Sequence, residues 1–217
     1  MNEKSFLQQE AYNHIKENIL SGKLEPDILY SETKLSSELG ISRTPVREAL
    51  QCLSQDGYIS IVPSRGFKIR TLSERDMEQS IQVRCAIEGY CAFKVCNERT
   101  SRKAQRLIRQ LDMLLQEMED TQNADDGHES FIQADHDFHL ALVAYAENDE
   151  FDQQFQRLLY LIHLTSKRAL NVSGRVEETL HEHRDFLEAL RQGDTSQAYN
   201  RIIKHLTMPI NLESDKG

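Results

Sequence analysis

The chain has 217 residues, of which 39% are hydrophobic, and a formal net charge of −9. This length can bury one sizeable core and a smaller one. No apolar run is long enough to span a bilayer, and no basic segment followed by an apolar run opens the chain, so we expect a cytoplasmic protein without a membrane partner. The four cysteines lack CxxC spacing and fall in predicted helices, which favours reduced thiols over disulfides or a zinc site.

The acidic charge belongs to the second part of the chain. Residues 1–72 hold nine Lys or Arg and nine Asp or Glu, so they sum to zero, and the remaining 17 basic and 26 acidic residues carry the whole −9. A neutral first part that concentrates arginine on one face can bind phosphate, whereas an acidic remainder limits other contacts with nucleic acid. We expect two domains, residues 1–72 and 73–217.

The segment from Gly40 to Leu53 predicts a turn followed by a helix. Ser42 is a suitable N-cap, and Pro45 is tolerated in a first turn, where backbone N–H groups have no intrahelical partner. Residues at helical spacing should face a small core: Val46, Leu50 and Leu53. The exposed side then carries Arg43, Thr44, Arg47 and Gln51. These side chains suit a DNA major groove because they can bond base edges or phosphates.

Further elements are predicted on both sides of this helix. Before it, E-T-K-L-S-S-E-L predicts a short helix with Leu35 and Leu39 inward, and Gly40 forms the corner. After it, D-G-Y-I-S-I-V-P-S-R-G-F-K-I-R predicts two strands joined by residues 63–66. The order predicts a winged helix-turn-helix.

Three motifs within residues 8–72 resemble the DNA-binding domain of the GntR family of bacterial transcription regulators: A-Y-N-H-I-K-E-N-I-L-S-G-K-L-E-P, S-R-T-P-V-R-E-A-L and S-R-G-F. Many members carry Arg or another long residue where this chain has Thr33, so a phosphate contact there is either missing or supplied by Lys34. The resemblance and the helix pattern together predict a set of DNA-binding residues: Lys34, Ser42, Arg43, Thr44, Arg47, Arg65 and Gly66. The alternative is that these arginines are solvated surface charge.

The rest of the chain contains few strand signals and predicts six helices. We expect them at 74–97, 101–121, 126–146, 149–170, 174–192 and 195–207, separated by polar or glycine-containing breaks. The expected fold class is therefore mainly α, an N-terminal winged helix-turn-helix followed by an all-α six-helix bundle.

Histidines lie on apolar faces of this bundle. His183 interrupts a stripe of apolar residues spaced by three and four, whereas His181 shares the polar face of the same helix. His205 is in line with apolar residues of the last helix, and Asp135 and His139 stand four apart on one face of the third. Buried and unpaired, such groups are costly, and a divalent metal removes that cost.

Periodicity alone leaves the metal site open. A buried histidine is more often a hydrogen-bonded core residue, and His136 competes with His139 for the inward position. However, V-R-C-A-I-E, F-I-Q-A-D-H-D-F-H-L-A-L, A-E-N, H-E-H-R-D-F-L-E-A-L-R-Q-G-D and K-H-L resemble the FCD-type ligand-binding domain of the FadR subfamily of GntR regulators. The length of this part resembles the VanR-like branch.

The second resemblance implies four metal ligands: Asp135, His139, His183 and His205. Zn²⁺ suits the imidazoles, and Ni²⁺, Mn²⁺ and Fe²⁺ also fit this donor set. If the coordination is octahedral, two positions stay open for water or an effector.

Arg84 lies among apolar residues on the first helix of the bundle, in one stripe with Glu88. Beside a metal, a guanidinium would favour a small organic acid as effector, because Arg binds carboxylates through two hydrogen bonds. The alternative is an internal Arg84–Glu88 ion pair, although the resemblance places this Arg in or near the effector cavity. Asn148 is the second expected effector-binding residue, unless it caps a helix. Further candidates for the cavity wall are Tyr90, Tyr160 and His163.

The expected function is a homodimeric transcription regulator, most simply a repressor, that binds an inverted repeat in double-stranded operator DNA and leaves it when a small carboxylate binds. One alternative is a regulator that senses the metal or uses it only structurally. A metal-dependent hydrolase is a further alternative. The DNA-binding domain argues against it, as does the lack of a general base, since Glu182 should project off the face of His183.

Overall fold

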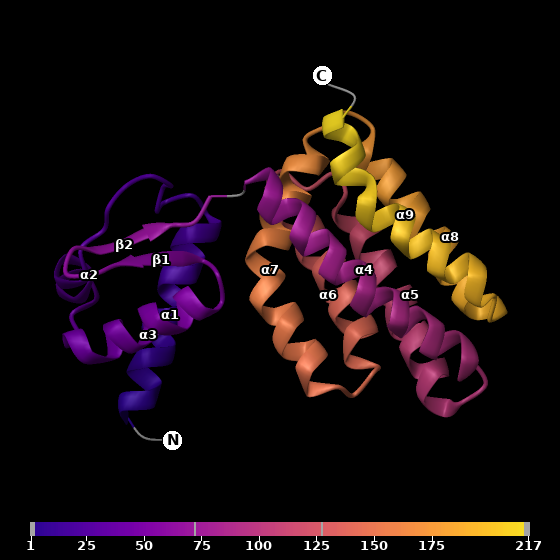
Figure 1. Cartoon of the computed structure of the whole chain (residues 1–217), viewed down its shortest axis with the longest axis horizontal. Helices are drawn as coiled ribbons and strands as arrows, with labels where there is room; N and C mark the ends of the chain where they lie inside the picture. Colours follow the sequence, from indigo (N-terminus) through magenta and orange to yellow (C-terminus); the bar gives the residue numbers. More distant parts are fainter. Residues whose placement is uncertain (1–2, 72, 127, 215–217) are drawn as a thin grey trace. The chain divides into compact units, whose positions relative to one another are not determined.

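The computed structural model describes residues 3–71, 73–126 and 128–214. The chain divides into two compact units, Met1–Thr71 and Leu72–Gly217, one residue from the boundary expected from the sequence. Figure 1 shows the strands in the first unit and a group of helices in the second. All four cysteines are free thiols.

The first unit is a winged helix-turn-helix. Its elements are α1 (Glu3–Leu20), α2 (Glu32–Leu39), α3 (Arg43–Gln55), β1 (Ile59–Val62) and β2 (Gly66–Ile69). The strands pair antiparallel, with Ile59 opposite Ile69 and Val62 opposite Gly66. Apolar residues of the helices and of the strand pair form its core, among them Ile15, Val46, Leu50, Leu53 and Phe67.

Two glycines shape the part of this unit that faces outward. Gly40 ends α2 with φ 66°, a left-handed conformation that glycine adopts without a Cβ penalty, and thereby makes the corner before α3. Gly66 has φ +134°, and a Cβ there would lie 1.9 Å from the backbone oxygen of Tyr30. Only glycine therefore lets the hairpin come close enough to Tyr30 to form the backbone bridge between Tyr30 and Phe67.

The second unit is the expected helical bundle. Its helices are α4 (Glu74–Asn97), α5 (Arg102–Thr121), α6 (Glu129–Ala144), α7 (Asp149–Leu170), α8 (Arg175–Gln192) and α9 (Thr195–Ser214). In Figure 1, α4 runs beside α9, α5 beside α6 and α9 beside α8. No helix in the described part of the chain is both long enough and apolar enough to cross a membrane.

The bounds of α6 and α9 differ from the prediction by more than one residue. α6 begins three residues later than expected, because His128 adopts φ 70° and the Asp126 carboxylate accepts a hydrogen bond from the Ser130 backbone N–H. α9 continues through Pro209 to Ser214 instead of ending at residue 207. Proline cannot donate to the carbonyl of His205 one turn earlier, but its fixed φ is compatible with a helix.

Candidate nucleic-acid interface and metal centre

The exposed side of α3 carries the polar residues that the periodicity predicts. Its apolar side is buried in the first unit, and Arg43, Thr44, Arg47 and Gln51 are exposed. Ser42 stands at the N-cap position as predicted, but its side chain makes no capping hydrogen bond. Its exposed hydroxyl is therefore not used by the helix.

A groove is bordered by α2, α3 and the β1–β2 hairpin, and we call it the α3 groove. Arg43 and Arg47 line one side, and Arg65 and Gly66 of the hairpin line another. Thr33 also borders it, whereas Lys34 is not part of its lining and pairs with Glu38 at 3.8 Å. Two arginines of α3 and one from the hairpin thus border one concave surface.

Glu32, which the sequence did not indicate, lies between the two arginines of α3. Its carboxylate accepts hydrogen bonds from Arg43 Nε at 3.3 Å and from Arg47 Nη2 at 2.8 Å. The hydrogen bond from Arg47 lowers the pKa of Glu32. The contacts join residues 11 and 15 positions apart across the turn, so no helical periodicity could have revealed them.

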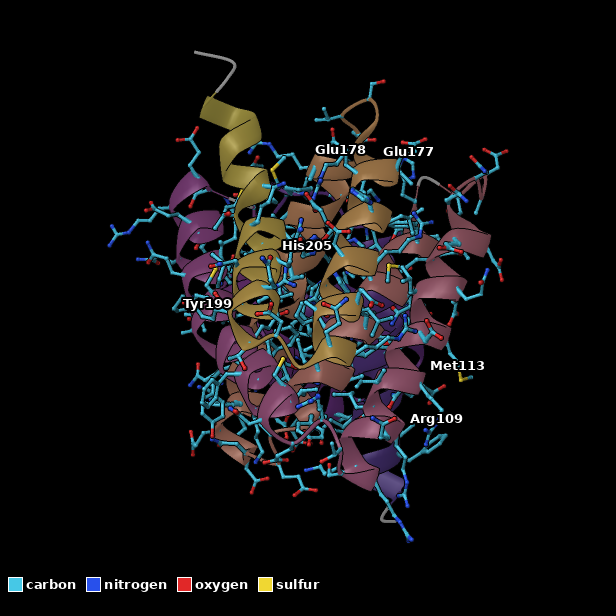
Figure 2. The ribbon with its side chains drawn as sticks, turned by 90° about the vertical axis from the view of Figure 1, so that its right-hand side faces the viewer. Arg109, Met113, Glu177, Glu178, Tyr199 and His205 are labelled. Atoms are coloured by element: carbon cyan, nitrogen blue, oxygen red, sulfur yellow. The ribbon has the colours of Figure 1, made fainter. Side chains whose placement is uncertain are left out.

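In the second unit, three helices bring together the four predicted metal ligands. α6 contributes Asp135 and His139, α8 contributes His183 and α9 contributes His205. One ligand atom from each lies within 4.8 Å of all the others, and all four residues are buried. We call them the Asp–His cluster. Figure 2 shows His205 on the side of α9 toward α8, whereas Tyr199 of α9 lies on the side of α4.

The imidazole Nε2 atoms converge inside this cluster. His139 Nε2 lies 3.2 Å from His205 Nε2, and His183 Nε2 lies 3.3 Å from Asp135 Oδ1. Despite that proximity, His183 Nε2 and Asp135 Oδ1 are buried without a hydrogen-bond partner among the described residues. Three nitrogens and a carboxylate oxygen suit Zn²⁺ and related divalent ions, which would satisfy both orphaned atoms. The residues therefore fit a metal ion.

The opposite nitrogen of each ring has a partner outside the cluster. His139 Nδ1 lies 2.5 Å from Glu88 Oε2, and His205 Nδ1 lies 2.9 Å from Glu182 Oε2. His183 Nδ1 donates to the backbone oxygen of Thr179 at 2.8 Å. Such contacts orient metal-binding histidines and leave Nε2 available as ligand. The sequence placed Glu182 off the face of His183, and in the structure its carboxylate reaches across from α8 to His205 of α9.

Burial and neighbouring charges shift the pKa values of the groups in and around the cluster. Burial lowers the pKa of His205 to about 3, which keeps that imidazole neutral, as a metal ligand must be. Although burial favours the protonated acid, the Arg84 charge lowers the pKa of Glu88 to about 2. For Asp135, burial is likewise outweighed by His139 and His183, so its pKa falls well below the usual value. The cluster thus combines a carboxylate with a neutral imidazole.

Arg84 forms the ion pair that the sequence offered as one alternative and keeps a further donor group unused. Its Nε donates to Glu88 Oε1 at 2.7 Å, so the internal ion pair is present. Its Nη2 is buried and has no hydrogen-bond partner among the residues that the structure describes. Glu88 connects this arginine to His139 through its second oxygen.

A cavity of about 40 Å³ adjoins the cluster. Arg84 of α4, Asp135 of α6, Thr165 of α7, Thr179 of α8 and His205 of α9 border it. We call it the cluster cavity. It brings the guanidinium predicted to bind an effector to the same space as two of the predicted metal ligands.

Asn148 does not border the cluster cavity. Its side chain accepts from the Glu150 backbone N–H at 3.0 Å and caps α7, the other role that the sequence allowed. Tyr90 is 48% exposed, and neither Tyr160 nor His163 is part of the wall. His136 does not belong to the Asp–His cluster, and its ring lies 6.0 Å from that of His163.

Comparison with known proteins gives matches to both units. Residues 79–208 match the family model of the FCD domain, and residues 7–69 match that of the bacterial regulatory proteins of the gntR family. The HTH-type transcriptional regulator YdhC of Bacillus subtilis is 29% identical over 199 residues, covering 89% of this chain and 85% of the relative. The HTH-type transcriptional repressor RspR of Escherichia coli is 24% identical over 200 residues, covering 92% and 86%.

Solved structures share the fold. McbR/YncC of E. coli has a TM-score of 0.76 at 20% identity and covers 100% of this chain and 99% of its own. A GntR regulator from Rhodococcus sp. RHA1 has a TM-score of 0.76 at 19% identity, covering 95% and 97%. The chain therefore belongs to the gntR family of bacterial regulatory proteins, with an FCD domain, and is a DNA-binding transcription regulator rather than an enzyme.

Proposed function

We propose that this regulator is a repressor that holds a divalent metal ion in its second unit and leaves its operator when a small organic acid binds beside the metal. One observation carries the proposal. The cluster cavity is bordered by two members of the Asp–His cluster and by Arg84, whose Nη2 has no hydrogen-bond partner among the described residues. The name of RspR, a repressor related along most of this chain, supports the direction of control.

In this proposal the α3 groove receives DNA. Arg43 and Arg47 read base edges in the major groove, since a guanidinium pairs with guanine through two hydrogen bonds. The hairpin residues Arg65 and Gly66 form the wing contact. The remaining predicted contacts, to phosphates and sugars, come from three exposed residues: Lys34, Ser42 and Thr44.

The regulator acts as a homodimer in this proposal. Val83, Tyr90 and Phe93 of α4 are 37–51% exposed and lie on one side of the helix at spacings of seven and three. Tyr199 of α9 is also exposed and lies against Gly89 of α4. Such a contiguous apolar surface marks an interaction site, and a second copy would cover it symmetrically. Two copies would present two α3 grooves to an inverted repeat.

The metal would be held by the Asp–His cluster, with Zn²⁺, Ni²⁺, Mn²⁺ or Fe²⁺ as candidates. When bound, the ion supplies positive charge and coordination positions for an oxygen ligand. Glu88, Glu182 and the Thr179 carbonyl hold the three rings in place for it. Arg84 and Thr165 on the wall of the cavity would orient the rest of an acid.

The size of the cluster cavity explains why ligand binding would alter the protein. A volume of about 40 Å³ accommodates water, whereas pockets for organic ligands typically measure roughly 300 Å³ or more. In this proposal, an organic acid enters as the surrounding helices move apart. A ligand that fits only the enlarged state shifts the population toward that state, as release from DNA requires.

Operator-release titrations test this function. Metal-replete protein is first used to select bound duplexes from fragmented genomic DNA, and the recovered operator is labelled for fluorescence anisotropy. Mono-, di- and hydroxycarboxylic acids are then titrated into the complex, in parallel with chelator-treated protein. We expect one acid class to release DNA from the metal-replete protein alone. If an acid releases DNA equally from the metal-free protein, the metal has no part in the response.

The small volume of the cluster cavity also favours a second candidate, a regulator that senses the metal itself. In that case, saturating metal added to chelator-treated protein changes operator affinity without any acid. An organic-acid sensor instead shows little change in operator affinity on metal addition and a large change when acid follows.

A further inference from the structure

The two arginines of α3 are bound to one carboxylate of α2. Glu32 contacts Arg43 Nε at 3.3 Å and Nη2 at 3.2 Å. It contacts Arg47 Nε at 3.3 Å and Nη2 at 2.8 Å. In both guanidinium groups it therefore engages the edge formed by Nε and Nη2. The edge formed by Nη1 and Nη2 is left for another acceptor, and it carries the two donors that a base edge needs.

The setting of Glu32 differs from that of an ordinary surface carboxylate. Its side chain is 20% exposed, whereas those of Arg43 and Arg47 are each 57% exposed. It occupies the first position of α2, where a negative charge is favourable, and its helix is fixed by the Ser31 cap. The carboxylate therefore has a firm position, and the two long side chains extend from it along the α3 groove.

We propose that Glu32 is a specificity-determining residue of the DNA-binding face, because it positions Arg43 and Arg47 for base edges and opposes phosphate at the same place. This inference rests on the proposed DNA contacts of the two arginines. A free arginine side chain has many rotamers and pairs readily with any phosphate. Held by one edge to a carboxylate, it presents its other edge in a defined direction. The negative charge also weakens attraction to the DNA backbone.

The Glu32→Gln substitution tests whether Glu32 sets the specificity of DNA binding rather than its overall strength. The substitution keeps the size of the side chain but removes its charge and weakens its hold on both guanidinium groups. The released arginines gain phosphate contacts, so binding to unrelated DNA tightens and each new contact makes the salt slope steeper by about 0.9. Base contacts lose their fixed geometry. The ratio of operator affinity to unrelated-DNA affinity therefore falls, by about tenfold if one bidentate contact is lost.

Glu38→Gln is the matched control. Glu38 belongs to the same helix, is 58% exposed and pairs with Lys34 rather than with an arginine of α3. Both substitutions remove one negative charge from α2. A general charge effect therefore changes the two variants alike, and a positioning effect changes only Glu32→Gln.

The experiment measures anisotropy of full-length, metal-replete protein with two duplexes across a salt series: the selected operator and a shuffled duplex of equal composition. We expect Glu32→Gln to lower the affinity ratio about tenfold and Glu38→Gln to leave it within about twofold of wild type. Adding Glu32→Gln to Arg47→Ala should lower the ratio less than it does in wild type, because one of its two partners is gone. Equal ratios for the two glutamine variants overturn the inference.

Arg43→Ala and Arg47→Ala distinguish this inference from the proposed function. If both bind the operator as tightly as wild type, the proposed DNA contacts are wrong. If both lose operator binding while Glu32→Gln behaves like Glu38→Gln, the contacts stand and only the positioning role of Glu32 fails. Thermal melts of each variant confirm that the comparison is made between folded proteins.

Discussion

A guanidinium group held by a glutamate recurs at both candidate sites. Arg84 is bound through Nε to Glu88, and its Nη2 remains without a partner among the described residues. Arg47 is bound by Glu32 through Nε and Nη2. Because a guanidinium has five donors in a rigid plane, one edge can be fixed by the protein while the other serves a ligand. This is a property that lysine cannot supply.

Replacing Arg47 with Ala tests the α3 groove. If this side chain makes a bidentate base contact, its loss costs about 1–3 kcal/mol of operator-binding free energy and relaxes specificity at one base pair. Competition titrations with operators altered at single positions measure both effects. Arg109→Ala, which removes an exposed positive charge from α5 of the second unit, is the control and should bind the operator as wild type does. An Arg47 variant with unchanged affinity would remove the residue from the interface.

Arg84 is best tested by substitution with Lys. Alanine would leave Glu88, which is fully buried, without its cationic partner, and breaking a buried pair typically costs about 3–5 kcal/mol. Lysine keeps a charge for Glu88 but loses the second edge of the guanidinium. We expect Arg84→Lys to fold, retain metal and bind the operator, yet to respond poorly to the organic acid. Normal release by the variant would leave Arg84 with a purely structural role.

At the scale of elements, helical periodicity predicted which faces of the helices are buried but not which residues of different helices are in contact. The apolar stripes correctly placed His183 and His205 inside the bundle, because an i, i+3, i+4 pattern reports which side of a helix is buried. On α6 the same pattern left His136 and His139 as alternatives, and both are buried. The contact of His139 with Glu88 joins positions 51 residues apart. Such a contact depends on which helices become neighbours, and that information is not periodic.

Asn148 acts as the N-cap of α7. An asparagine before a helix serves as N-cap or points into a cavity with the same sequence signal, and only the path of the chain decides between them. Here the side chain accepts from Glu150 and stabilises the start of α7. The late start of α6 has a related cause, since Asp126 caps the helix instead of joining it.

Asn148→Ala therefore affects stability rather than regulation. Loss of the cap should lower the free energy of unfolding by about 1 kcal/mol, whereas Asn148→Asp should retain most of it. Denaturant titrations of the two variants measure this difference. Metal content and acid-induced release should match those of wild type in both. A variant of unchanged stability that no longer responds to acid would return Asn148 to the effector site.

At the scale of the whole molecule, the two units differ in net charge and each has its own candidate functional site. The first is neutral and has three of its four arginines on the α3 groove. The second carries the acidic charge and contains the Asp–His cluster. Each has its own core, so substitutions in the cluster should leave the first unit folded. The division explains how one chain can bind DNA despite its net charge of −9.

The metal centre is checked by elemental analysis of protein purified without chelators. We expect about one divalent ion per chain in wild type and most of it lost in His183→Ala, because a central ligand is missing. His181→Ala is the control, since that side chain is 73% exposed on the other side of α8, and its metal content should equal that of wild type. Wild-type protein that contains no metal and takes up none when Zn²⁺, Ni²⁺, Mn²⁺ or Fe²⁺ is added would contradict the metal-dependent regulation proposed here.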